Sequence, residues 1–98
     1  MCGAPAQELL SSDVGDEAVV QGIVSRAGLP LGGAYVRLLD ATGEFTAEVQ
    51  TSDNGVFRFF AAPGDWTLRT LASGGASVDT SVSAIRGKAV QTTLEVPA

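Results

Sequence analysis

The dominant pattern along the chain is an alternation of apolar and polar residues with a period of two. It is clearest at 45–51, where Phe45, Ala47 and Val49 alternate with polar residues. A period of two sends successive side chains to opposite faces of a β-strand. Applied along the chain, it predicts strands at about 18–25, 34–39, 45–51, 56–60, 66–71, 78–84 and 89–96.

Turn-forming residues separate these strands. Pro30 and three glycines make 26–33 a loop, and 40–43 and 62–65 have the composition of tight turns. Asn54-Gly55 predicts a two-residue hairpin between the segments 45–51 and 56–60, because both residues tolerate positive φ. About seven short strands without a convincing helix predict an all-β fold, an antiparallel Greek-key β-sandwich.

The chain length suits one such domain. Its 98 residues are enough for one modest hydrophobic core. Residues 1–16 mix small, polar and acidic types without a sustained period, so we expect a flexible N-terminal arm followed by a single β-sandwich domain over 17–98. Nothing at the N-terminus has the basic and apolar regions of a secretory signal, which favours a cytoplasmic location.

Composition removes several classes of function. The net charge of −5 opposes binding to nucleic acid or to anionic membranes. The chain has no histidine and one cysteine, which excludes histidine-based catalysis and a His/Cys zinc site. We therefore expect neither a cofactor nor a metal.

Strand alternation also assigns directions to the side chains that could carry function. Phe57, Phe59, Trp66 and Leu68 fall on the inward register. Outward positions hold three arginines flanked by apolar residues, and if the strands 34–39, 66–71 and 56–60 are neighbours they form one patch: Tyr35, Arg37, Arg58, Phe60, Arg69 and Leu71. Arginine and aromatic residues are enriched in protein interfaces, so the patch predicts a contact with a protein partner or with a second copy. An oxyanion site and solvated arginines paired with Glu48, Asp40 or Asp65 are the alternatives.

The same residues carry a resemblance to known sandwiches. The stretches Val20-x-Gly22-x-Val24, Gly28-x-Pro30-x-x-Gly33-Ala34, Asp53-x-Gly55-x-Phe57-x-Phe59 and Pro63-Gly64-x-Trp66-x-Leu68 resemble the carboxypeptidase regulatory-like, or transthyretin-like, β-sandwich superfamily. This resemblance implies a sandwich module that is mostly non-catalytic in its relatives, and it fixes fold rather than function.

A closer resemblance covers nearly the whole domain. GAYVRLLDATGEFTAEVQ and GVFRFFAAPGDWTLRTL, with the opening Met1-Cys2-Gly3, are similar to a small uncharacterised actinobacterial family. Its members are labelled as putative sulfur-metabolism proteins and are commonly encoded near thiosulfate sulfurtransferases. The resemblance implies a non-catalytic interaction or accessory module in a sulfur-metabolism context, docking on such a sulfurtransferase or self-associating.

Cys2 supports an alternative function. If Met1 is removed, the thiol becomes part of an N-terminal aminothiol, whose ammonium lowers the thiol pKa. Such a thiolate could accept a sulfane sulfur as a persulfide, which would make the protein a sulfur carrier or sulfurtransferase. An incidental exposed thiol is the simpler interpretation.

Overall fold

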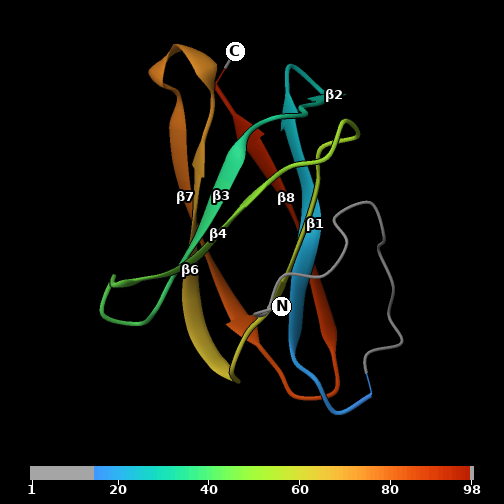
Figure 1. Ribbon diagram of the computed structural model, residues 1–98, viewed down its shortest axis with the longest axis vertical. Coiled ribbons are helices and arrows are strands. Elements are labelled where there is room, and N and C mark those ends of the chain that lie inside the picture. Colours follow the sequence, from blue (N-terminus) through green and yellow to red (C-terminus); the bar gives the residue numbers. More distant parts are fainter. Residues whose placement is uncertain (1–14, 98) are drawn as a thin grey trace.

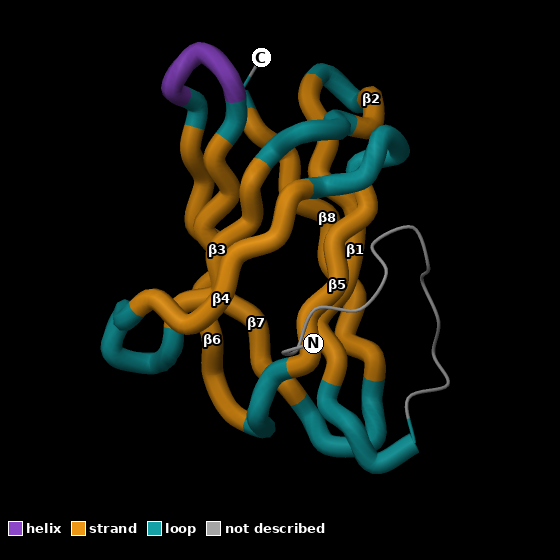
Figure 2. The backbone as a smooth tube through the Cα atoms, in the orientation of Figure 1, coloured by secondary structure: helices purple, strands orange, loops and turns teal. Residues whose placement is uncertain are grey.

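Two β-sheets face each other in a computed structural model that describes residues 15–97 (Figure 1). The predicted all-β sandwich is confirmed, and the smooth trace of Figure 2 shows strands with short connections. The elements are β1 (Val19–Arg26), β2 (Leu29–Pro30), β3 (Tyr35–Leu39), β4 (Phe45–Gln50), β5 (Val56–Phe60), β6 (Gly64–Leu71), a 3-10 turn η1 (Ser73–Gly75), β7 (Ser77–Ala84) and β8 (Ala89–Val96). The arm predicted over residues 1–16 lies outside the described residues, apart from Gly15 and Asp16.

The two sheets differ in strand direction. The sheet built on β3, called the β3 sheet, has the order β4-β3-β6-β7 and is antiparallel throughout. In the other, called the β1 sheet, β1 pairs with β2 and β5 on one side and with β8 on the other. The β1–β8 pair is parallel, so the prediction of a fully antiparallel sandwich is wrong there. Alternation assigns a face to each residue but says nothing about the direction of the neighbouring strand.

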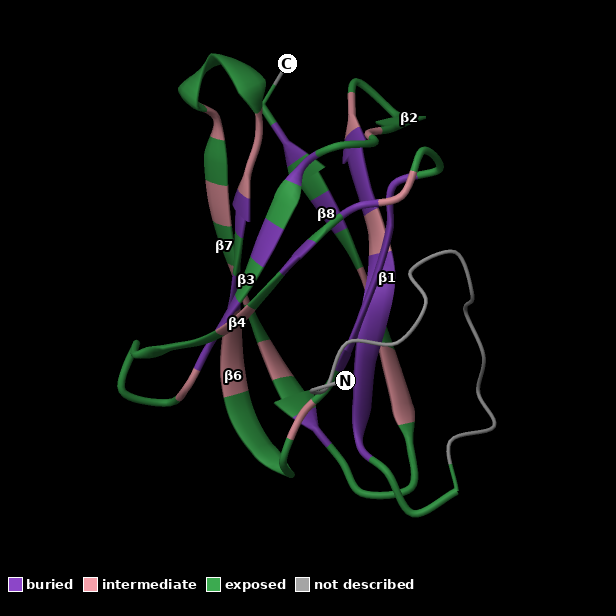
Figure 3. Cartoon of the chain, viewed as in Figure 1, coloured by how far each residue is buried: buried purple, intermediate pink, exposed green. Residues whose placement is uncertain are grey.

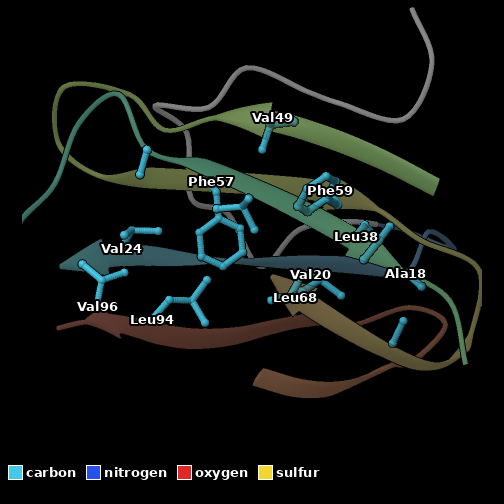
Figure 4. Packing of buried hydrophobic residues seen from close by; sticks show 13 residues of the cluster. Ala18, Val20, Val24, Leu38, Val49, Phe57, Phe59, Leu68, Leu94 and Val96 are labelled. Carbon is cyan, nitrogen blue, oxygen red and sulfur yellow. The ribbon is translucent and has the colours of Figure 1, made fainter. Parts of the chain in front are cut away.

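The inward faces of both sheets form one hydrophobic core (Figure 4). Phe57, Phe59 and Leu68 are fully buried in it, as their predicted inward direction requires. Trp66 is half-buried against this cluster, and its indole N–H donates a hydrogen bond to the carbonyl oxygen of Ala62. The direction predicted for these four side chains is therefore confirmed.

The turn at Asn54-Gly55 does not make a hairpin. β4 pairs with β3, whereas β5 pairs with β1, so the turn carries the chain from one sheet to the other. Of the two turn residues Asn54 and Gly55, only Gly55 has a positive φ, at 76°. The Ser52 hydroxyl accepts hydrogen bonds from the backbone N–H groups of Asn54 and Val56, which holds the turn without strand pairing. Local turn chemistry specifies a reversal of the chain but not which strands pair after it.

Gly22 marks the closest approach inside the β1 sheet. A Cβ atom at this position would lie 1.7 Å from the backbone oxygen of Thr92 on β8. Only glycine leaves room for the two backbones and for Phe57 on the adjacent β5, whose ring would lie 3.1 Å from the same Cβ atom. The glycine therefore permits β8 to pack against β1.

Candidate functional site

The outward face of the β3 sheet carries a row of four charged side chains. Arg37 on β3 lies directly opposite Arg69 on β6, Glu48 on β4 lies opposite Arg37, and Asp79 on β7 lies opposite Arg69. The order across the sheet is therefore Glu48, Arg37, Arg69, Asp79. Like charges directly opposite each other are unfavourable, and here a carboxylate on each outer strand compensates for the two central guanidinium groups.

Both arginines make ion pairs within this row. Arg37 Nε lies 2.7 Å from Glu48 Oε2. Arg69 holds Asp79 at two points, with Nε 2.9 Å from Oδ1 and Nη2 3.0 Å from Oδ2. The hydrogen bond to Asp79 raises the pKa of Arg69, and the hydrogen bond from Arg69 lowers the pKa of Asp79. Since each guanidinium has five N–H donors, pairing with one carboxylate leaves donors for a second acceptor.

Apolar side chains surround the charged row. Tyr35 on β3 and Leu71 on β6 lie directly opposite each other as the next pair on the same outward face, and Tyr35 is 44% exposed. Phe45, at the start of β4, is 61% exposed, and the Arg37 guanidinium carbon lies 6.0 Å from its ring centroid. The pattern at 45–51 assigned Phe45 to the apolar face, and a β-bulge between Leu38 and Leu39 changes that assignment.

Arg58 and Phe60 do not belong to this surface. Their strand, β5, pairs with β1 in the opposite sheet, so the condition on which the six-residue patch depended, that the segment 56–60 neighbours 66–71, is not met. The place beside β6 is taken by β7. Arg58 lies opposite Gln21 and is only 7% exposed, with its guanidinium carbon 5.9 Å from the Phe60 ring centroid. The structure thus brings together four of the six predicted residues: Tyr35, Arg37, Arg69 and Leu71.

The carboxylates that pair with the arginines were predicted in part. Glu48 is the partner of Arg37, as one of the alternatives proposes, whereas the described structure pairs neither Asp40 nor Asp65 with an arginine. Asp79 was missed. Its signal is symmetry about the loop at 73–77, because Arg69 and Asp79 lie five residues before and after Gly74, and a hairpin folded there places them opposite each other.

A shallow hollow adjoins the charged row on the same sheet. It has a volume of about 380 Å³, and its lining includes Asp65, Thr67, Ser81 and Ser83. The Ser83 hydroxyl donates a hydrogen bond of 2.9 Å to Asp65 Oδ1. Within residues 15–97 no group of three or more His, Cys, Asp or Glu side chains is placed to hold a metal ion. Cys2 lies outside the described residues.

Comparison with known proteins establishes the family. The sequence profile of the family described as "Protein of unknown function (DUF1416)" matches residues 2–96. The chain belongs to this family. Two uncharacterised proteins of Mycobacterium tuberculosis are each 53% identical to it over 79 residues, which is 76% of this chain and 79% of theirs. An uncharacterised protein of Mycolicibacterium smegmatis is 56% identical over 64 residues, or 64% of this chain and 71% of that protein.

Solved structures share the fold of this DUF1416 protein. The crystal structure of S.CueP is similar with a TM-score of 0.60 and 16% identity, over 86% of this chain and 64% of that chain. A DUF3823 family protein from Parabacteroides merdae is similar with a TM-score of 0.56 and 18% identity, over 85% and 47%. The chain thus spans less than two thirds of either protein, and at these identities the likeness is one of fold alone. In the described part of the chain, no helix is long and apolar enough to cross a membrane.

Proposed function

We propose that this DUF1416 protein is a non-catalytic interaction module that binds a protein partner through the outward face of the β3 sheet. The observation that carries the proposal is the direct pairing of Arg37 with Arg69, beside a pair formed by the exposed Tyr35 and the half-buried Leu71. Arginine and aromatic side chains together are typical of the cores of protein interfaces. The absence of histidine from the sequence supports a binding role over acid–base catalysis.

The chemistry of the face favours a partner that presents carboxylates. The protein as a whole has a net charge of −5, which repels acidic proteins. The charged row is different, because its two guanidinium groups lie at the centre and its two carboxylates at the flanks. A carboxylate of the partner can accept hydrogen bonds from the remaining N–H donors of both arginines, while Tyr35 and Leu71 contact its apolar groups.

The family resemblance suggests the identity of the partner. We place the module in the cytoplasm and in sulfur metabolism, with a thiosulfate sulfurtransferase as its partner. The sulfur-metabolism setting and the partner rest on the resemblance of the sequence to a family whose members carry that label. The face described above supplies the means of binding.

Charge reversal on the face tests the proposal. The full chain is titrated with the thiosulfate sulfurtransferase of the same organism in a calorimeter. We expect Arg69→Glu and Arg37→Glu each to weaken binding at least about tenfold, because each variant sets a carboxylate against the carboxylates of the partner. Arg86→Glu is the matched control, since the Arg86 side chain is 73% exposed and lies on the turn after β7. Equal affinity for all variants, or no binding by the unaltered protein, contradicts the proposal.

The same protein preparations separate the other candidate functions. Binding that survives both charge reversals but is lost in Cys2→Ser, together with a sulfur adduct in the intact mass, would replace docking with sulfur transfer. A change in the mass of the free protein in sedimentation with Arg37→Glu, which pairs with β4 rather than with β7, would show that the β3-sheet face binds a second copy.

A further inference from the structure

β7, one of the two edge strands of the β3 sheet, is long and regular. It runs for eight residues and pairs with β6 along its whole length without a register shift. On its other side it pairs with no strand in the described part of the chain, and it lies at the margin of the sheet in Figure 1. From Ser77 to Ser83 its side chains alternate between exposed and half-buried, and Ala84 at its end is buried (Figure 3).

The hydrogen bonds of the β6–β7 hairpin determine which backbone groups face outward from the edge. The backbone N–H of Ala72 donates to the carbonyl oxygen of Ala76, so these two residues form a hydrogen-bonded pair. Hydrogen-bonded pairs alternate along an antiparallel ladder, so Val78, Thr80 and Val82 bond to β6. The N–H and C=O groups of the remaining residues point away from β6, toward the free edge: Ser77, Asp79, Ser81 and Ser83.

This edge lacks the features that usually prevent strands from pairing. β7 contains no proline, lysine or arginine, and its one charged residue, Asp79, is already paired with Arg69. The opposite edge of the same sheet is less regular, because a β-bulge interrupts the pairing of β4 with β3. An exposed regular edge is a template for another strand.

We propose that β7 pairs antiparallel with β7 of a second copy of the chain, with the two-fold axis passing at Thr80. This register sets Asp79 opposite Ser81 of the second copy and Ser77 opposite Ser83, and these are the residues whose backbone groups face the edge. Val78 then lies opposite Val82 of the second copy, on the inward face. The two β3 sheets become one continuous sheet across the dimer.

Side-chain burial favours a second copy at β7 over one at β8, the edge strand of the β1 sheet. Val78 and Val82 are only half-buried in the single chain, and the pairing covers them with each other. On β8 the inward residues Leu94 and Val96 are already 1% exposed and the inward valine that remains half-buried is Val90, so pairing there would cover less additional apolar surface. The charges also match, because Asp79 faces a serine rather than a second aspartate.

The pairing is independent of the proposed docking function. It uses the backbone edge of β7, whereas docking uses the outward side chains of β3 and β6, which the dimer leaves accessible. A dimer would present two such faces in one sheet and would bind a bivalent partner with increased avidity. Failure of one proposal therefore leaves the other standing.

Cross-linking tests the register. In the Cys2→Ser background, Thr80→Cys places two thiols at the two-fold axis, in a non-hydrogen-bonded pair with Cα atoms roughly 4.5 Å apart. This separation permits a disulfide. We expect Thr80→Cys to form a covalent dimer on mild oxidation. Ser81→Cys on the same strand and Thr46→Cys on the opposite edge strand should form no covalent dimer, because their thiols lie away from the two-fold axis. A covalent dimer in either control variant, or none in Thr80→Cys, overturns the proposal.

Sedimentation equilibrium tests the pairing without a cross-link. Ser81→Pro removes an N–H that faces the free edge and leaves the β6 ladder intact, so it should raise the dimer dissociation constant at least about tenfold. Ser81→Ala keeps the N–H and should dimerise like the unaltered chain. Thr80→Lys places two ammonium groups at the two-fold axis and should also prevent the dimer. This second variant tests the proposal even if Ser81→Pro does not fold. A protein that is monomeric before any substitution contradicts the proposal.

Discussion

Arginine side chains on the outward faces of the two sheets lie in different environments. Arg37 and Arg69 in the β3 sheet are each 44% exposed in their side chains and pair with carboxylates on neighbouring strands. Arg58 in the β1 sheet is also at an outward position of its strand, but it is 7% exposed. Strand alternation gives all three the same outward direction. Their environment depends on which strands lie beside them and on what covers the sheet.

Burial on both faces distinguishes the β1 sheet more generally. Figure 3 shows β1 buried along most of its length. Val19 and Gln21 are both 0% exposed, although they lie on the face turned away from the core. In β3, by contrast, exposed Tyr35 and Arg37 alternate with buried Val36 and Leu38. Substitutions should therefore reduce the stability of the β1 sheet strongly and that of the β3-sheet face weakly.

The largest effect is expected at the close approach of β1 to β8. Gly22→Ala forces a Cβ atom against the backbone of Thr92, so the free energy of unfolding should fall by about 3 kcal/mol or more. Gly43→Ala in the β3–β4 turn is the control, because it meets no atom within 4 Å and changes only the backbone preference at φ 86°. That variant should lose about 1 to 2 kcal/mol. Urea denaturation measures the free energy of unfolding of both variants. Equal losses would show that the β1 sheet is packed no more tightly at Gly22 than the β3–β4 turn is at Gly43.

An intermediate effect is expected at the buried arginine. Arg58→Ala removes a long side chain from a covered surface and should reduce the free energy of unfolding by about 2 to 3 kcal/mol. Arg37→Ala removes an exposed ion pair and should cost less than about 1 kcal/mol. Arg58→Met retains most of the aliphatic stem and separates packing from charge. Thermal unfolding of the three variants is the measurement, and similar losses for Arg58→Ala and Arg37→Ala would remove the contrast between the faces.

The smallest change in stability is expected on acidification. Hydrogen bonds from Arg69, Thr42 and Ser25 lower the pKa values of Asp79, Asp40 and Glu95 respectively. The unfolded chain then binds protons more readily than the folded one. The stability due to these carboxylates is present above their unfolded pKa values of about 4 and is lost as the pH falls through the lower folded values.

Denaturation across this acid range checks the sign. Stability should fall as the pH drops below about 4, and Asp79→Asn should make the fall shallower. A stability that rises on acidification would contradict the assignment.

Particular residues show how far the sequence alone could predict this protein. Phe57, Phe59 and Leu68 are inward in the structure, because each apolar side chain gains by leaving water wherever its strand is placed. The turn at 40–43 is likewise local: Gly43, with φ 86°, donates its N–H to the carbonyl oxygen of Asp40. Asn54-Gly55 is equally strong as a local signal, yet the strands before and after it, β4 and β5, belong to different sheets.

In the candidate site, too, some features follow from local sequence and others from strand pairing. The outward directions of Arg37 and Arg69 follow from alternation, and their juxtaposition follows from the pairing of β3 with β6. The separation of Arg58 follows from the pairing of β5 with β1. A period of two is a property of one strand, and the sequence by itself determined it. Strand order, strand direction and the cover over each sheet depend on backbone hydrogen bonds and packing between segments far apart in the chain, so only the tertiary structure decided them.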